Sequence, residues 1–179
     1  MTRKEIILGI TGSIAAYKAC DITGLLKKEG FGVIPILTKE AAEFITPLTL
    51  ETLACGRAFT GMFEPPEEWD PLHVSLADRA SLILIAPATA NVIGKLASGV
   101  CDDLLTCVVF ASDKPVLIAP AMNDRMYRHE IVQGNIAELK KIGYKFIGPV
   151  KGHLACGREG IGRLAPSEEI VAQVKRLLK

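Results

Sequence analysis

The sequence predicts an α/β fold in which a mainly parallel sheet is covered by helices on both faces. Short apolar runs alternate with longer segments of mixed polarity along the whole chain of 179 residues, which is the pattern of strand–helix–strand units. The runs are apolar throughout instead of alternating, as in strands that are buried on both faces. Hydrophobic residues make up 49% of the chain, enough for one continuous core, and the length fits a single domain.

The first strand–turn–helix unit is the clearest candidate for a binding site. Residues 6–10 predict a buried strand, residues 11–13 a tight turn, and residues 14–29 a helix with Ser13 as its N-cap. Such a unit brings backbone N–H groups and the positive end of a helix dipole to one point, which favours an anion and most often a phosphate. The alternative is that Gly12 serves only a sharp turn, because one glycine-containing turn is a weak motif.

The second strand argues against a dinucleotide. Residues 31–37 predict this strand, which ends at Thr38, whereas an NAD-binding fold places Asp or Glu at that end to hold the ribose 2′-hydroxyl. Residues 40–55 then predict helix that is interrupted at Pro47, with Thr46 and Pro47 beginning its second part.

A long irregular segment at residues 56–72 precedes the next strand and is rich in glycine and proline. A loop of this length in a compact domain usually has a function, as a lid or a binding segment, and Trp69 is expected to anchor it. His73 opens the short helix that follows. On its local context alone, a single histidine is more often a structural or surface residue than a catalytic one.

The strand at residues 81–86 repeats the arrangement of the first unit. It is followed by a turn of small and hydroxyl residues at 87–91 and by a helix to Ala97. Thr89 and Asn91 offer hydrogen-bond donors in this turn. Because ligands bind outside the carboxyl ends of the strands in open α/β sheets, the two turns predict one phosphorylated ligand held between them.

The rest of the chain continues the alternation. Residues 120–123 follow a strand and therefore face the ligand, and the glycine-rich residues 148–163 predict a flexible flap with Cys156 at its middle. The other expected elements are a turn at 99–103 in which Asp102 and Asp103 cap the next helix, a helix at 104–111, a strand at 115–119, an amphipathic helix at 124–143 that breaks near Gly134, a strand at 144–147 and a last helix from Pro166.

Composition argues against several classes of function. The net charge is +1 and there is no basic block, which argues against nucleic acid and against an anionic membrane surface as partners. No apolar run approaches the roughly 20 residues of a membrane-spanning helix, and the first residues lack the apolar region of a secretory signal, so a cytoplasmic protein is expected. The five cysteines form no C-x-x-C pair, so neither a disulfide framework nor a metal site is predicted.

Several motifs, taken together and in order, resemble those of a known family. They are residues 9–15 (Gly-Ile-Thr-Gly-Ser-Ile-Ala), His73, residues 87–91 (Pro-Ala-Thr-Ala-Asn), residues 120–126 (Pro-Ala-Met-Asn-Asp-Arg-Met) and residues 155–163 (Ala-Cys-Gly-Arg-Glu-Gly-Ile-Gly-Arg). On these residues the chain resembles the flavin-containing cysteine decarboxylases, most closely those that act on phosphopantothenoylcysteine in coenzyme A synthesis. The resemblance spans essentially the whole chain, and the Met-Asn and Ala-Cys-Gly motifs are specific when they occur together.

The resemblance implies a Rossmann-like or flavodoxin-like three-layer fold, with residues 1–179 forming one FMN-binding flavoprotein domain. The implied reaction converts (R)-4′-phosphopantothenoyl-L-cysteine to 4′-phosphopantetheine and CO2. FMN first oxidises the cysteine to a thioaldehyde, CO2 then leaves as an enethiolate forms, and protonation with return of the hydride completes the cycle. Two alternatives are a peptidyl-cysteine decarboxylase with the same flavin chemistry and a non-catalytic FMN-binding regulatory protein.

The resemblance also implies roles for individual residues. His73 is the implied base, Asn123 is implied to hold the substrate carboxylate, and Cys156 is implied to protonate the enethiolate. The residues implied in FMN binding are Gly12, Ser13, Ile14, Thr38, Pro87, Ala88, Thr89, Ala90 and Asn91, and those implied in substrate binding are Ala121, Met122 and Asn123. A phosphorylated substrate also needs basic contacts, for which the candidates are Lys151, Arg158 and Arg163.

Partners follow from the same resemblance. Family members form active sites between subunits of trimers, which can assemble further into dodecamers, so a homo-oligomer with His73 and Asn123 at a shared site is implied. In many bacteria the domain is fused to a phosphopantothenoylcysteine synthetase. Val92 stands where the family often has Thr, and Tyr127 where Trp is common. Neither departure removes a catalytic group.

Overall fold

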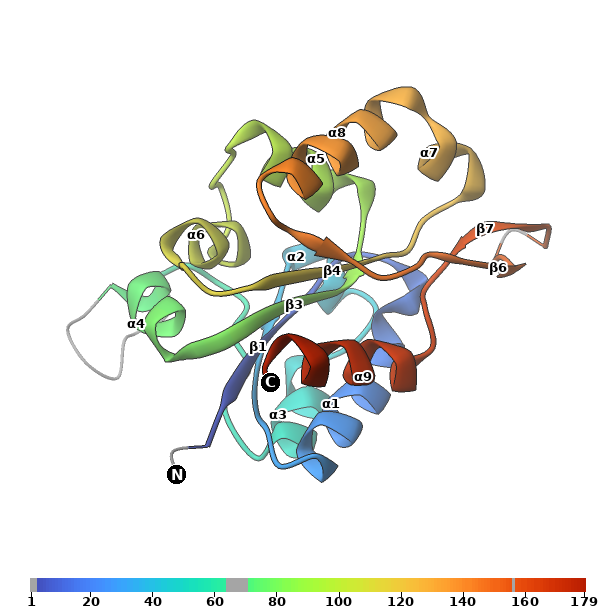
Figure 1. Cartoon of the computed structure of the whole chain (residues 1–179). Helices are drawn as coiled ribbons and strands as arrows, with labels where there is room; N and C mark the ends of the chain where they lie inside the picture. Colours follow the sequence, from blue (N-terminus) through green and yellow to red (C-terminus); the bar gives the residue numbers. More distant parts are fainter. Residues whose placement is uncertain (1–2, 64–70, 156) are drawn as a thin grey trace.

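The structure is a computed structural model that describes residues 3–63, 71–155 and 157–179. In this part of the chain, five parallel strands form the main sheet in the order β2-β1-β3-β4-β5 (Figure 1). They are β1 Glu5–Ile10, β2 Gly32–Leu37, β3 Ala80–Ala88, β4 Val116–Pro120 and β5 Lys145–Phe146. The parallel sheet confirms the predicted fold class, and the strand order is that of flavodoxin-like folds.

Helices cover both faces of this sheet. One face carries α1 Lys18–Lys28, α3 Pro47–Ala54 and α9 Ser167–Leu177, and the other carries α4 Leu72–Arg79, α5 Ala90–Ser98, α6 Leu104–Ala111 and α8 Glu130–Lys141 (Figure 1). The 3-10 turn η1 Ile14–Tyr17 and the short helices α2 Lys39–Ala42 and α7 Asp124–Arg128 follow the carboxyl ends of strands. Within the described ranges, each helix is too short or too polar to cross a membrane.

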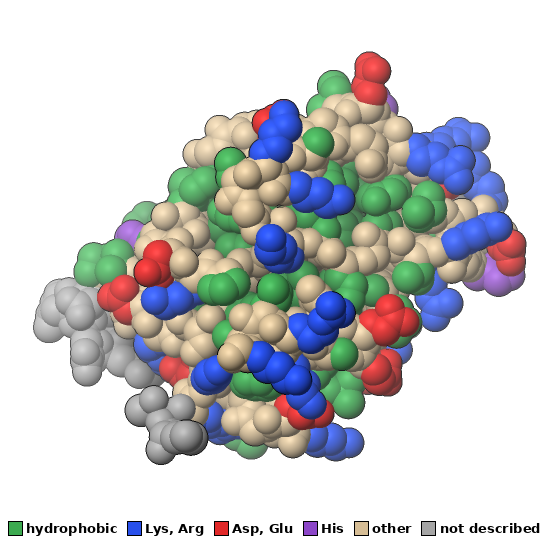
Figure 2. Space-filling model, in the orientation of Figure 1, with side chains coloured by type: hydrophobic (Ala, Val, Ile, Leu, Met, Phe, Trp, Pro, Cys, Tyr) green, Lys and Arg blue, Asp and Glu red, His purple; other side chains and the backbone are tan. Residues whose placement is uncertain are grey.

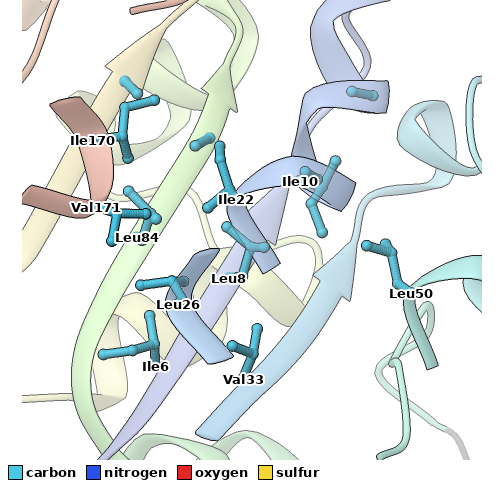
Figure 3. Packing of buried hydrophobic residues seen from close by; sticks show 14 of the residues in the cluster. Ile6, Leu8, Ile10, Ile22, Leu26, Val33, Leu50, Leu84, Ile170 and Val171 are labelled. Atoms are coloured by element: carbon cyan, nitrogen blue, oxygen red, sulfur yellow. The ribbon is translucent and has the colours of Figure 1, made fainter. Parts of the chain in front are cut away.

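The strands bury side chains on both faces, as the uninterrupted apolar runs predict. Ile6 and Leu8 of β1 pack with Ile22 and Leu26 of α1 (Figure 3), whereas Ile7 belongs to the core on the opposite face. All five side chains are fully buried. Burial of a side chain of this size stabilises a fold by about 1.5–3 kcal/mol, so the sheet is a firm platform for the turns at its edge.

The predicted helix at residues 124–143 is two helices. The expected break near Gly134 is wrong, because Gly134 lies inside α8 and the chain breaks at His129. His129 has an extended backbone, and its ring Nδ1 accepts a hydrogen bond from the N–H of Ile131 at 3.3 Å. A side chain that caps a helix start in this way decides the boundary more strongly than the propensity of one glycine.

The glycine-rich segment, expected as a flap, is more regular than its composition indicates. β6 Val150–His153 and β7 Glu159–Arg163 form an antiparallel two-stranded ribbon that lies beside α7 (Figure 1). The pairing shifts by one residue at its base, so Gly162 is an extra residue in β7 and forms a β-bulge. Cys156, like Trp69, lies outside the described residues.

Candidate active site

Thr11 joins the turns that follow β1 and β3. Its buried hydroxyl donates a hydrogen bond to the carbonyl oxygen of Pro87 (2.7 Å) and accepts one from the N–H of Thr89 (3.0 Å). The two turns that were predicted to hold one ligand are therefore linked directly. The sequence contains no sign of this role, because the partners of Thr11 lie more than 70 residues away and only the fold brings them together.

A cavity of about 310 Å³ opens at these turns. It is lined by Ser13, Thr38 and Thr89, whose side-chain oxygens each accept a hydrogen bond of 3.3–3.4 Å from the backbone of the helix that they begin. Each hydroxyl keeps its own hydrogen as a donor, and the helix starts add backbone N–H groups and positive dipole ends. This donor set suits a phosphate.

Most of the residues implied in FMN binding line this cavity, namely Gly12, Ser13, Thr38, Thr89, Ala90 and Asn91. A Cβ at Gly12 would lie 2.4 Å from the Cβ of Glu40, so glycine permits the close approach of α2 as well as the turn. Pro87 and Ala88 are buried and line neither this cavity nor the larger one described next. Their carbonyl oxygens accept the N–H groups of Thr11 and Ala121, which holds the neighbouring loops in place.

Lys95 of α5 is a charged part of the cavity wall that sequence reasoning did not identify. Its Nζ lies 2.7 Å from Asp102 and 2.8 Å from Asp103. Burial acts to lower the pKa of Lys95, but the hydrogen bonds to the two carboxylates raise it overall. Asp103 in turn caps α6 through a capping box with Thr106, which confirms the predicted cap.

A larger cavity of about 670 Å³ adjoins the first. Ser13, Ala121 and Met122 line both cavities, so one ligand can contact both. The remaining walls come from η1 with Ile14, the start of α1, Asn123 before α7, the ribbon with its turn, and the start of α9. Small-molecule sites commonly measure about 300–1,000 Å³, so the two cavities offer room for a cofactor and a small substrate.

Asn123 is held by the helix that it begins. Its Oδ1 accepts a hydrogen bond of 2.9 Å from the N–H of Arg125, which makes Asn123 the N-cap of α7. The oxygen of the side-chain amide is thereby directed to the helix start. A fixed amide donor on the wall of a cavity is a suitable contact for a carboxylate.

The ribbon is docked onto the loop that carries Asn123. The N–H of Met122 donates to the carbonyl oxygen of Gly162 at 2.9 Å, and a Cβ at Gly162 would lie 2.1 Å from the carbonyl oxygen of Met122. Asp124 lies 3.5 Å from Arg158, the residue just before β7. Since Ala155 lines the larger cavity, the segment leading to Cys156 belongs to the same site as Asn123.

His73 lies apart from these groups. It is half-buried near the start of α4, a helix that packs against α6, and it lines neither of the two cavities. Figure 1 shows α4 and the ribbon at opposite ends of the molecule. Within one chain, the structure therefore brings together the turns that line the smaller cavity, Asn123 and the ribbon, but not His73.

The sequence family described as Flavoprotein matches residues 1–179. The chain belongs to this family. It is 46% identical over 171 residues to the coenzyme A biosynthesis bifunctional protein CoaBC of Bacillus subtilis, with 96% of this chain and 42% of that protein covered. It is 42% identical over 177 residues to a probable phosphopantothenoylcysteine decarboxylase of Streptococcus mutans, with 98% of this chain and 99% of that protein covered. The chain thus spans less than half the length of the bifunctional relatives that it matches.

Solved structures agree with the fold assignment. A PPC decarboxylase mutant complexed with pantothenoylaminoethenethiol matches with a TM-score of 0.86 and 30% identity, covering 98% of both chains. The FMN binding protein AtHal3 matches with a TM-score of 0.83 and 31% identity, covering 98% of this chain and 96% of that one. Both comparisons extend over the whole three-layer fold, including the elements that form the cavities.

Proposed function

We propose that this flavoprotein binds FMN and decarboxylates 4′-phosphopantothenoylcysteine to 4′-phosphopantetheine in coenzyme A synthesis. The observation that carries the proposal is the adjacency of two cavities, one lined by hydroxyl groups at the strand ends and one walled by Asn123 and the ribbon. The Streptococcus mutans relative, matched over its full length, is named a probable phosphopantothenoylcysteine decarboxylase. This supports the assignment over other uses of the fold.

The residues of the smaller cavity fit the phosphate of FMN. Ser13, Thr38 and Thr89 would donate hydroxyl hydrogens to it, and the helix starts would supply backbone N–H groups. Met122, which lines both cavities, would contact cofactor and substrate. When bound, FMN supplies the reversible two-electron oxidation of the substrate cysteine that makes loss of CO2 possible. The FMN binding of AtHal3 supports this choice of flavin.

Asn123 would hold the substrate carboxylate through its amide NH2 group. The hydrogen bond from Arg125 already occupies the amide oxygen at the helix start, and the amide nitrogen is the donor atom of this side chain. A neutral donor orients the carboxylate without the strong ground-state stabilisation that a cation would give to a charge about to leave as CO2.

Cys156 would protonate the enethiolate that remains after CO2 has left. A thiol can donate its S–H proton to a carbanion-like centre, which is the role that the reaction needs here. Cys156 lies outside the described residues, and its neighbour Ala155 on the wall of the larger cavity supports its delivery to this site.

His73 would act as the base in the site of a neighbouring subunit. An imidazole is the side chain used most often as a general base, but in one chain α4 lies at the far end of the molecule from α7, the helix that Asn123 begins (Figure 1). A homo-oligomer, a trimer or a dodecamer built from trimers, would bring the two together. The proposed enzyme acts in the cytoplasm, and the naming of CoaBC as bifunctional supports an association with a phosphopantothenoylcysteine synthetase domain.

The direct test is a comparison of two substrates with the FMN-loaded protein. We expect mass spectrometry to show loss of one CO2 from phosphopantothenoylcysteine and none from a peptide that ends in cysteine. A peptide-only reaction would make this a peptidyl-cysteine decarboxylase, and a flavin-bound protein inactive on both would favour a regulatory role. Asn123→Asp serves as the inactive control, because it keeps the cap acceptor of α7 while removing the amide donor.

A further inference from the structure

The larger cavity contains a positive charge that the proposed chemistry does not use. Among the described residues that line it, Lys18, His153 and Arg163 are basic. Lys18 lies 2.8 Å from Asp21, and His153 lies 3.9 Å from Glu159. The guanidinium of Arg163, by contrast, has no hydrogen bond or ion pair with any residue that the structure describes.

The β-bulge decides which way Arg163 faces. Val150 pairs with Arg163, whereas the next residue, Lys151, pairs with Ile161, so the extra residue Gly162 reverses the alternation of β7. Val150 and Arg163 accordingly line the larger cavity, while Lys151 and Ile161 line a separate cavity of about 540 Å³. Without the bulge, Arg163 would share the face of Ile161 and point away from the site.

The ribbon also leaves room for the arginine side chain. A Cβ at Gly152 would lie 3.3 Å from Cδ and 3.4 Å from Nη1 of Arg163, so the side chain runs closely over the backbone of β6. Arg158, another basic residue of this segment, lies 3.5 Å from Asp124 instead. Figure 2 shows Lys and Arg side chains gathered at the end of the molecule that carries α7 and the ribbon.

We infer that Arg163 binds the terminal phosphate of the substrate and thereby selects phosphorylated over unphosphorylated substrates, an inference that rests on the proposed function. A guanidinium presents two parallel N–H donors that match a phosphate better than other side chains do. Lys18 adds a second positive charge nearby. Its pKa is raised mainly by the hydrogen bond to Asp21, and the charge of Arg163 acts in the opposite direction, so an anion between the two cations relieves their repulsion.

Two phosphates must be distinguished, that of the cofactor and that of the substrate. The hydroxyl-lined cavity with Thr38 and Thr89 suits the FMN phosphate, and Arg163 does not line it. Arg163 therefore serves the other phosphate. The same contact would act against peptides, which offer no phosphate to the ribbon.

The experiment measures steady-state decarboxylation of phosphopantothenoylcysteine and of pantothenoylcysteine. Three FMN-loaded proteins are compared: wild type, Arg163→Gln and Lys151→Gln. We expect Arg163→Gln to raise KM for the phosphorylated substrate by about 10–100-fold, the range of a charge-assisted hydrogen bond. Its kcat/KM for the unphosphorylated substrate and its FMN affinity should stay within about twofold of wild type. Lys151→Gln removes the same charge from the other face of the ribbon. We expect it to change neither KM for the phosphorylated substrate nor the affinity for FMN.

Equal losses on the two substrates, or no loss, would overturn the inference while leaving the decarboxylase proposal intact. A loss of FMN affinity in Arg163→Gln would assign the arginine to the cofactor phosphate and also overturn it. Calorimetric binding of 4′-phosphopantetheine and pantetheine separates the two proposals. Arg163-dependent preference for the phosphorylated ligand in a protein that releases no CO2 would sustain the phosphate site and reject the decarboxylase.

Discussion

At the scale of single residues, the site depends on a few side chains that have both a structural and a chemical task. Asn123 begins α7 with its amide oxygen and is proposed to hold a carboxylate with its amide nitrogen. Thr11 links the turns after β1 and β3 with one hydroxyl that donates and accepts. These double tasks allow substitutions that remove one role and keep the other.

Asn123→Asp is such a substitution. Aspartate keeps an N-cap acceptor for the N–H of Arg125. We therefore expect the free energy of unfolding to stay within about 0.5 kcal/mol of wild type. The second carboxylate oxygen would repel the substrate carboxylate, so we expect kcat/KM to fall by at least about 100-fold. Unfolding and steady-state kinetics on FMN-loaded protein measure the two effects. Retained turnover would remove Asn123 from the proposed site.

At the scale of elements, the ribbon and the helix caps fix the shape of the site. β7 lies so close to residues 121–124 that two of its glycines have no room for a side chain. An added Cβ would lie 2.8 Å from the Cβ of Asp124 at Gly160, and 2.1 Å from the carbonyl oxygen of Met122 at Gly162. The ribbon is thus positioned by backbone contact with the segment that carries Asn123.

We therefore expect Gly162→Ala to lower stability by about 1–3 kcal/mol, because the added methyl group overlaps a backbone oxygen that has little freedom to move. Decarboxylation should fall further than FMN binding, since the ribbon contributes to the larger cavity. Gly134→Ala is the matched control, because nothing lies within 4 Å of a Cβ there, and it should be neutral or stabilising by up to about 1 kcal/mol. Urea unfolding of both variants checks this, and equal behaviour of the two would contradict the close docking.

The cap of α6 predicts a dependence of stability on pH. Burial acts to raise the pKa of the Asp103 carboxyl, but hydrogen bonds with Lys95 and Thr106 outweigh it and hold the pKa below its ordinary value of 3.8. A carboxyl whose pKa is lowered by folding stabilises the fold fully above its unfolded-state pKa, and this contribution is lost as the pH falls through the folded-state pKa.

Asp103→Asn keeps a capping side chain but cannot ionise. We expect it to be less stable than wild type near pH 7, and we expect the difference to shrink as the pH falls below about 4. Urea unfolding across this range measures the difference in the free energy of unfolding. A gap that stays constant with pH would show that the charge of Asp103 makes no contribution.

At the scale of the whole molecule, one chain presents an incomplete set of the proposed catalytic groups. Asn123 and the ribbon lie at one end, and α4 with His73 lies at the other (Figure 1). If neighbouring subunits complete each site, two inactive variants can restore activity in a mixed oligomer. We expect co-expressed His73→Asn and Asn123→Asp chains to regain about a quarter of wild-type activity, the share of sites that random mixing makes intact.

Each variant expressed alone provides the control for this mixing. Activity of the mixture no higher than that of the single variants would contradict a shared site. It would require His73 and Asn123 to act in the same chain or His73 to have no catalytic part.

Local signals in the sequence predicted much of the fold and part of the site. Apolar runs marked the strands, and the caps at Ser13, Thr46 and Asp103 lie where the residues predict them, because a cap depends on a few neighbouring residues. The break at His129 and the bulge at Gly162 were missed, since tertiary contacts decide which of several weak local signals prevails. The contacts of Thr11 were missed because its partners lie more than 70 residues away. Those of Lys95 with Asp102 and Asp103 were missed because the fold of the intervening turn decides them.

The turns after β1, β2 and β3 line one cavity at the carboxyl edge of the sheet, which we propose is the flavin site. The most direct measurement is the flavin content of the purified protein, followed by titration of any apoprotein with FMN. We expect a yellow protein that binds one FMN per chain and loses affinity when Thr89 is replaced by Val. A colourless protein that cannot be reconstituted with FMN would contradict the account.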